Sequence, residues 1–202
     1  ITVVDYGKGN LWSVISALRY IGCTPILSSN PDEVAKADVL LLPGVGSFRK
    51  AMIALQERAL DEAILEAVQN QGAKILGICL GMQLLGMRSS EDGETEGLGL
   101  IKSNVENFSP EEISGNKVPH IGFDLVHSDS DTVLFKGLPS AADFYFVHSY
   151  RMLATDLSGK SATCNYGIDF LAAYESDNIF ATQFHPEKSQ TNGLILLKNF
   201  MA

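Results

Sequence analysis

The segment KILGICLGMQLL, residues 74–85, places one cysteine between two glycines, where a β-rich apolar run changes to a helical pattern. The run before Cys79 predicts a buried strand, and the residues after it predict a helix. A strand that turns directly into a helix strains the residue at the turn, and small residues two positions away on each side let the strand and helix approach closely. Gly77 and Gly81 meet that requirement. The segment therefore predicts an α/β fold with Cys79 at a strand-to-helix turn.

The remainder of the first half alternates between short strand-like runs and helical patterns. The runs at residues 1–5, 24–28 and 38–44 predict strands, and the patterns at residues 10–22, 30–37 and 47–72 predict helices. Such alternation predicts a mostly parallel central sheet flanked by helices, with the loops that follow the strands along one edge. We expect ligands to bind at that edge.

The second half of the chain has a different pattern. A polar, glycine-rich stretch at residues 91–100 is followed by strand-like runs with little helix between them, at residues 143–150, 170–176 and 178–184. These runs predict an antiparallel or mixed extension of the sheet, and a final helical pattern closes the chain. Neither an internal repeat nor a linker is visible, so we expect one domain over residues 1–202.

Composition narrows the classes of partner. Of the 202 residues, 46% are hydrophobic and 19% are charged, and the net charge is −9 without a Lys/Arg cluster, so a nucleic-acid partner is not expected. The sequence shows no membrane-spanning run and no export leader, which predicts a soluble cytoplasmic protein without membrane contact. The cysteines at positions 23, 79 and 164 are odd in number and widely spaced, which predicts a reducing compartment and no structural metal. We also expect no cofactor.

Cys79 has two interpretations. As a nucleophile, it would gain from the helix that follows, because a helix start stabilises a thiolate and the amide of Leu80 would point toward a developing oxyanion. As a structural residue, it would pack like a small apolar side chain.

A candidate base lies near the end of the chain, in ATQFHPEKS at residues 181–189. Pro186 restricts the backbone around it, so we expect His185 and Glu187 to share one extended, stiff geometry with their side chains on the same side. Glu187 could then orient one imidazole nitrogen while the other faces the thiol. The alternative is a surface turn in which Glu187 makes a solvated contact with His185.

A glycine-containing segment and three further histidines give weaker indications of function. In LLPGVGSF, residues 41–48, the glycines let the backbone near Val45 and Gly46 present a second amide to an oxyanion, at the same predicted sheet edge as Cys79. Three further histidines are expected to be structural or superficial. We expect His120 and His148 to have satisfied structural roles and His127 to lie on the surface.

These motifs together resemble those of the class I glutamine amidotransferases, in particular GICLGMQ (residues 77–83), PGVGSF (residues 43–48) and FHPEKS (residues 184–189). DYGKGN (residues 5–10), VPHIGF (residues 118–123) and YFVHSYR (residues 145–151) are similar to motifs of the glutaminase subunits of imidazole glycerol phosphate synthases. The resemblance runs from Val3 to the last helical pattern and implies a flavodoxin-like amidotransferase fold.

The resemblance implies hydrolysis of L-glutamine to glutamate and ammonia by a Cys-His-Glu triad. Cys79 would attack the side-chain amide and form a thioester, His185 would protonate the departing ammonia and later activate water, and Glu187 would orient His185. The amides of Gly46 and Leu80 would serve the oxyanion. The side chains of Gln83 and Glu91 would contact the α-amino and α-carboxylate end of glutamine. The backbone of Ser149 and Tyr150 would contact the same end.

The resemblance also implies a heterodimer. Ammonia would pass to a (β/α)₈ cyclase subunit that makes imidazole glycerol phosphate and an aminoimidazole carboxamide ribotide in histidine biosynthesis. Asn10, Phe123 and Lys188 fall where the family places its interface and ammonia gate. Each residue also has a simpler structural interpretation. Asn10 would then serve only as a helix cap, Phe123 would belong to the ordinary core, and Lys188 would be a solvated surface residue.

One departure from the family pattern keeps other functions open. Phe123 and Asp124 stand where the histidine-pathway enzymes usually have tryptophan and asparagine. Paralogous subunits supply ammonia to sugar-modifying amidotransferases in surface polysaccharide synthesis, so the identity of the partner stays open. Two further alternatives are an autonomous thiol hydrolase acting on γ-glutamyl amides and a binding protein that has lost catalysis.

Overall fold

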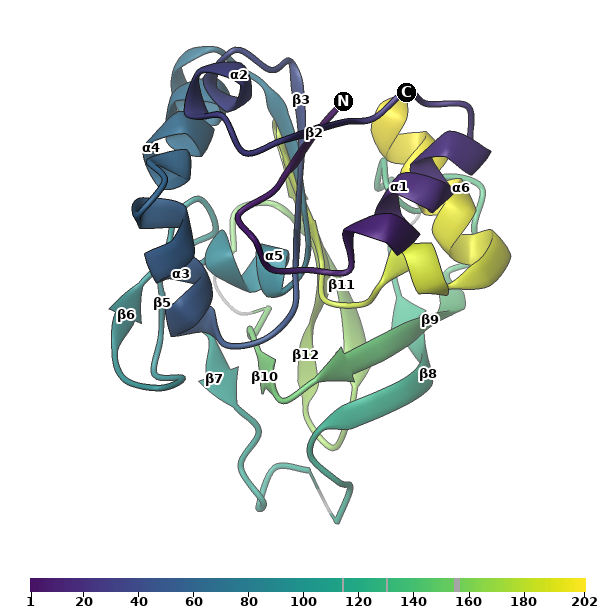
Figure 1. Ribbon diagram of the computed structural model, residues 1–202. Helices are drawn as coiled ribbons and strands as arrows, with labels where there is room; N and C mark the ends of the chain where they lie inside the picture. Colours follow the sequence, from purple (N-terminus) through teal and green to yellow (C-terminus); the bar gives the residue numbers. More distant parts are fainter. Residues whose placement is uncertain (114, 130, 155–156) are drawn as a thin grey trace.

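Helices lie on both faces of a nine-stranded sheet in the computed structural model, which describes residues 1–113, 115–129, 131–154 and 157–202 (Figure 1). The strand order is β2-β1-β3-β4-β13-β12-β11-β8-β9. The parallel half contains β1 (Thr2–Val4), β2 (Ile26–Ser28), β3 (Val39–Gly44), β4 (Lys74–Cys79) and β13 (Ile179–Thr182). The antiparallel half adds β12 (Asp169–Ser176), β11 (Lys160–Asn165), β8 (His120–His127) and β9 (Ala141–His148).

The helices of the first half lie between successive parallel strands, except for the last of them, which follows β4. They are α1 (Leu11–Tyr20), α2 (Pro31–Ala35), α3 (Phe48–Gln56), α4 (Leu60–Leu65) and α5 (Leu80–Leu84). A π-helical turn (Glu66–Asn70) continues α4, a 3₁₀ turn (Pro186–Lys188) follows β13, and α6 (Gln190–Met201) closes the chain. Two small ribbons, β5 (Arg88–Ser89) with β6 (Thr95–Glu96) and β7 (Glu106–Asn107) with β10 (Tyr150–Arg151), lie outside the main sheet.

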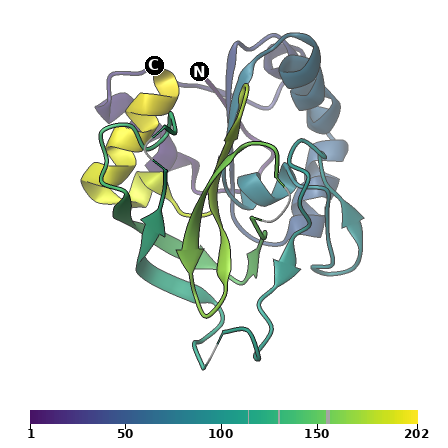
Figure 2. The same ribbon diagram turned by 180° about the vertical axis from the view of Figure 1, so that it is seen from behind.

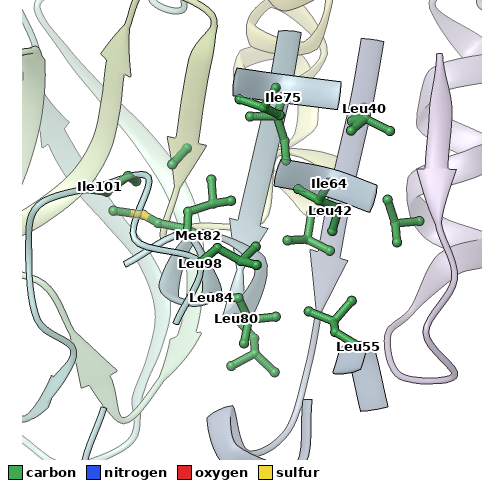
Figure 3. Close-up of a cluster of buried hydrophobic side chains, with 14 of the residues drawn as sticks. Leu40, Leu42, Leu55, Ile64, Ile75, Leu80, Met82, Leu84, Leu98 and Ile101 are labelled. Atoms are coloured by element: carbon green, nitrogen blue, oxygen red, sulfur yellow. The ribbon is translucent and has the colours of Figure 1, made fainter. Parts of the chain in front are cut away.

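The core has two parts, one on each face of the sheet. Successive residues of a strand point to opposite faces, so Leu40 and Leu42 of β3 join the cluster beneath α2 to α5, whereas Leu41 joins the cluster beneath α1 and α6. Figure 3 shows the first cluster, where Leu55 of α3 and Ile64 of α4 lie against the sheet. Coverage on both faces explains why the central strands are almost continuously apolar.

The structure confirms the predicted fold class and corrects details. The predicted strands and helices of the first half are present, although the helix after Cys79 is short, ending at Leu84. β8 and β11 were missed. In β8 the apolar side chains of Ile121, Phe123 and Leu125 alternate with Gly122 and Asp124, but they lie on the exposed face of the strand. β11 is short and contains small, polar residues.

Sheet topology brings the two ends of the chain together. β13 runs parallel to β4, with Thr182 opposite Ile78, so both strands leave the sheet at the same edge (Figures 1 and 2). On the other side of β4, Gly44 of β3 lies opposite Cys79. The turns that follow β3, β4 and β13 are therefore neighbours. None of the helices in the described parts of the chain combines the length and apolarity that crossing a bilayer requires.

Candidate active site

Cys79 ends β4 and begins α5 in a backbone conformation that is rare for a residue with a side chain. Its φ is 54° and its ψ is −110°, and the residue is buried. A Cβ atom on Gly77 would lie 2.8 Å from the amide nitrogen of Met82, and one on Gly81 would overlap the carbonyl oxygen of Leu42. The predicted strained turn with small flanking residues is confirmed.

The imidazole of His185 is paired with the carboxylate of Glu187. Nδ1 of His185 lies 2.7 Å from Oε1 of Glu187, and both side chains are buried. The predicted contact is present, but the predicted extended geometry is wrong, because residues 186–188 form a 3₁₀ turn. The fixed φ of Pro186 suits the first position of such a turn, which brings the two side chains together.

A buried hydroxyl fixes the backbone of His185 to β9. Ser189 Oγ donates to the carbonyl of His185 at 2.6 Å and accepts from the amide of Tyr145 at 2.9 Å. The amide of His185 in turn donates to the carbonyl of Tyr145 at 2.9 Å. The imidazole is therefore held from two strands, β13 before it and β9 beside it. Sequence reasoning missed Ser189 because a serine after a turn has no distinctive pattern.

His185 and Cys79 interact electrostatically. Burial lowers the pKa of His185. Hydrogen bonding and charge from Cys79 and Glu187 raise this pKa by more than burial lowers it, so the result is a pKa of about 9. Nε2, on the opposite side of the ring from Glu187, makes no hydrogen bond of standard geometry to the described residues. Hydrogen bonds in catalytic pairs are often long or poorly aligned before substrate binds.

A cleft of about 310 Å³ opens beside the sulfur atom of Cys79. Its wall contains every residue that was predicted to serve the oxyanion or to bind glutamine, namely Gly46, Leu80, Gln83, Glu91, Ser149 and Tyr150. Gly46 has a φ of +105°, a conformation that favours glycine, in the turn that follows β3. The tertiary structure therefore brings these residues to one site.

Two of the predicted glutamine-binding side chains are already oriented by protein contacts. Gln83 Nε2 donates to the carbonyl of Tyr150 and to Oε1 of Gln183, both at 2.9 Å. Glu91 Oε2 accepts from the amide of Phe48, at the start of α3, at 2.7 Å. Burial raises the pKa of Glu91, against the lowering effect of the Phe48 amide.

Gln183 was quoted within the motif at residues 181–189 but was given no role, and the structure places it beside the nucleophile. Its Nε2 lies 3.7 Å from Sγ of Cys79, and the residue is fully buried. The sulfur also lies 3.8 Å from the carbonyl oxygen of Val147. The signal that could have identified Gln183 was a polar residue near the end of the mostly apolar run NIFATQF, residues 178–184.

His120 and His148 are buried and hydrogen-bonded, as predicted, and His148 also lines the cleft. His120 Nδ1 and His148 Nε2 are 3.1 Å apart and both residues are buried, while His127 is exposed. His148 Nδ1 is 2.8 Å from the carbonyl of Tyr150, and Nε2 of His120 is 3.4 Å from Asp124. Burial lowers the pKa of His148 to about 3, so this ring is neutral at physiological pH.

The three residues predicted at an interface or gate lie at or near the surface. Phe123 is 46% exposed, which excludes the ordinary-core interpretation, and its ring centroid lies 5.5 Å from that of Tyr145. Lys188 is half-buried, with Nζ 5.7 Å from the centre of the same Tyr145 ring. Asn10 is exposed at the start of α1, but its side chain donates to the hydroxyl of Ser13 at 2.8 Å instead of capping the backbone.

Comparison of sequences identifies full-length relatives. The profile of the family described as "Glutamine amidotransferase class-I" matches residues 2–202. "Imidazole glycerol phosphate synthase subunit HisH 1" of Campylobacter jejuni strain RM1221 is 47% identical, over 100% of this chain and 98% of the relative. "Imidazole glycerol phosphate synthase subunit HisH" of Moorella thermoacetica is 42% identical, over 99% of this chain and 93% of the relative.

Solved structures with similar folds are more distant in sequence. One, described as "Crystal structure of glutamine amidotransferase", has a TM-score of 0.77 at 16% identity and covers 100% of this chain and 97% of its own. A chain of "Structure of PurLQS from Thermotoga maritima" has a TM-score of 0.74 at 20% identity. The match covers 99% of this chain and 96% of that one. These likenesses concern the fold, whereas the profile match and the full-length relatives show the family. This chain belongs to the class-I glutamine amidotransferase family.

Proposed function

We propose that this chain is the glutaminase subunit of an imidazole glycerol phosphate synthase, in which the whole of residues 1–202 acts as one domain. The observation that carries the proposal is the cleft beside Cys79, whose backbone is strained. The buried imidazole of His185, which is already paired with the carboxylate of Glu187, lies next to it. The names of the full-length relatives support the histidine pathway over the sugar-modifying alternative.

The first half of the reaction forms a thioester. The Cys79 thiolate attacks the side-chain carbonyl carbon of glutamine, and the negative charge moves to the carbonyl oxygen. We assign the amides of Gly46 and Leu80 to this oxyanion, because both residues line the cleft beside the sulfur. His185 gives its proton to the departing nitrogen, and the C–N bond breaks to release ammonia.

The second half of the reaction releases glutamate. His185, now neutral, accepts a proton from a water molecule, which attacks the thioester carbonyl and regenerates the Cys79 thiolate. Glu187 stabilises the imidazolium at each stage through its bond to Nδ1. The raised pKa of His185 suits a group that must carry a proton before the first step.

Selection of glutamine falls to the other end of the cleft. Gln83 uses its NH₂ group on protein acceptors, which leaves its carbonyl oxygen for the α-ammonium group of a ligand. Glu91 has one oxygen committed to Phe48, so we assign its other oxygen to the same ammonium. The backbone around Ser149 and Tyr150 lines the wall where the α-carboxylate would lie. A cleft of this volume, at the lower end of the usual range for ligand sites, suits one amino acid.

The ammonia would leave for a (β/α)₈ cyclase subunit in a heterodimer. Free ammonia is mostly protonated near neutral pH and is then a poor nucleophile, so direct transfer avoids that loss. We place the interface on the outer face of β8 near Phe123 and the gate at Lys188 and Tyr145, with Asn10 also contributing. Exposed Ile121, Phe123 and Leu125 support an interface there, because they share one face of the strand.

The first experiment uses Cys79→Ala in complex with the cyclase. We expect glutamine-dependent synthesis to be lost, while synthesis from added ammonium salts continues at the wild-type rate, because only the nucleophile is removed. Glutamate release and product formation are measured together. Glutamine use by the variant complex would contradict the assignment of the nucleophile.

The second experiment tests the partner. Glutamate release by the isolated chain is compared with release in the presence of the cyclase. Stimulation by the cyclase supports the subunit, and high activity in the isolated chain would favour an autonomous γ-glutamyl hydrolase. A sugar-modifying synthase that co-purifies and is stimulated instead would favour the paralogous subunit.

A further inference from the structure

Gln183 is a fully buried polar residue beside the reactive sulfur. It follows β13 directly and lies two residues before His185. Its backbone amide donates to the carbonyl of Ala172 at 2.8 Å, which fixes where the side chain starts. A buried carboxamide is costly unless its donor and acceptor groups find partners, so the partners of this side chain explain why a polar group is present here.

The orientation of its carboxamide follows from a chain of hydrogen bonds. The carbonyl oxygen of Tyr150 can only accept, so Gln83 must present its NH₂ group to it. The same NH₂ group of Gln83 then faces Gln183, which must present its oxygen. The NH₂ group of Gln183 is thereby left pointing at Sγ of Cys79. One backbone carbonyl thus determines which end of Gln183 faces the sulfur.

The sulfur atom of Cys79 lies between two groups of opposite hydrogen-bonding character. The carbonyl oxygen of Val147, at 3.8 Å, can only accept and so favours the protonated thiol. The NH₂ group of Gln183, at 3.7 Å, can only donate and so favours the thiolate. The contact with Gln183 is buried, and a hydrogen bond to an ion is stronger away from water. Of these two groups, only Gln183 selects the nucleophilic form.

We propose that Gln183 is a positioning residue of the glutaminase reaction: its carboxamide holds the Cys79 thiolate by an N–H···S bond and holds Gln83 in the orientation that receives the substrate ammonium. The second part of this proposal, the orientation of Gln83 toward the substrate, rests on the proposed function. Its first part concerns the sulfur alone and can be measured without glutamine.

The test measures alkylation of Cys79 by iodoacetamide in the full chain, with the modified peptide identified by mass spectrometry. We expect Gln183→Met to react about 10-fold more slowly than wild type at pH 7, because an N–H donor to a charged group is lost. At pH 10, where ordinary thiols are largely ionised, both proteins should react at similar rates. In the complex with the cyclase, the same variant should also raise KM for glutamine, because Gln83 loses its partner.

Thr182→Val is the matched control. Thr182 is the preceding residue, is also buried, and donates to the carbonyl of Phe184 at 3.0 Å without contacting the sulfur. We expect this variant to alkylate like wild type at both pH values. Circular dichroism and thermal unfolding report whether each variant folds. If Gln183→Met does not fold, Gln183→Asn, which is too short to bridge Cys79 and Gln83, takes its place.

Two results would overturn the proposal. One is an unchanged alkylation rate at pH 7 in a folded Gln183 variant, and the other is a slowing that is equal at pH 7 and pH 10. Failure of the proposed function would give a different result. The Cys79→Ala complex would still use glutamine, while Gln183→Met would still slow alkylation of Cys79 at pH 7.

Discussion

At the scale of single residues, His185 shows how strongly position changes chemistry. An unperturbed histidine is mostly neutral at pH 7. In this protein, burial works against the charged ring, but Cys79 and Glu187 raise the pKa to about 9. The motif predicted the pairing with Glu187. It could not predict the size of the effect, because the contribution from Cys79 depends on the meeting of two distant segments.

The raised pKa of His185 predicts a pH-dependent stability. The unfolded pKa is about 6.5, so below that pH both states carry the proton and the stabilisation is complete. As pH rises toward 9 the unfolded state loses its proton first, and the free energy of unfolding falls by at most about 1.4 kcal/mol per pH unit. Urea unfolding between pH 6 and pH 10 measures this slope. Glu187→Gln should show a smaller slope, and an equal slope in both proteins would contradict the assignment.

Lys188 offers a second test at the residue scale. Its Nζ lies over the ring of Tyr145, which also contacts Phe123, and none of these side chains lines the glutamine cleft. We expect Lys188→Ala in the complex to leave KM for glutamine unchanged, because Lys188 does not line the glutamine cleft. The ratio of glutamate to synthesised product should rise above that of wild type. Lys198→Ala, on exposed α6 surface, is the control and should leave the ratio unchanged.

At the scale of elements, the connection between β4 and α5 controls the site. The glycine spacing predicted this turn correctly, since the requirement for small residues is local. The shape of the segment at residues 185–188 was predicted wrongly as extended, although the contact it makes was predicted correctly. An i, i+2 contact is possible both in an extended chain and in a tight turn, so the pairing of residues alone does not decide the backbone.

Gly81→Ala tests the close approach of α5 and β3. An added methyl group would overlap the carbonyl oxygen of Leu42, so the helix must shift, at a cost of about 3 kcal/mol. Gly137→Ala is the comparison, because the space around Gly137 is open and only its φ of +80° opposes a side chain, so this change should cost about 1–2 kcal/mol. Chemical denaturation measures both. Alanine favours a helix over glycine, so Gly81→Ala without any loss of stability would show that crowding is unimportant at position 81.

At the scale of the whole molecule, β8 presents an apolar face that the chain itself does not cover. Ile121, Phe123 and Leu125 are 59%, 46% and 49% exposed. Exposed apolar residues grouped on one strand face indicate a protein interface. Sequence reasoning reached Phe123 only through the family resemblance, since exposure of this face follows from the order of strands in the sheet.

Phe123→Glu therefore tests where the cyclase binds. A charge in the centre of an apolar interface should weaken binding by at least about 10-fold, equivalent to about 1.4 kcal/mol. Ile53→Glu is the control, because Ile53 is similarly exposed, at 42%, on α3, which lies away from β8 in both views (Figures 1 and 2). Titration calorimetry with the cyclase measures both affinities. Equal affinities for the two variants would place the interface elsewhere.

The amino-acid sequence by itself determined the features that depend on neighbours along the chain: the alternation of strands and helices, the glycine-flanked turn at Cys79, and the pairing of His185 with Glu187. The tertiary structure decided which distant groups meet. Gln183 faces the sulfur, Ser189 ties His185 to β9, and the β8 face stays uncovered because β13 lies beside β4 and the later strands extend the sheet from there. Periodicity and spacing describe local geometry, whereas the order of strands in a sheet depends on packing across the whole chain.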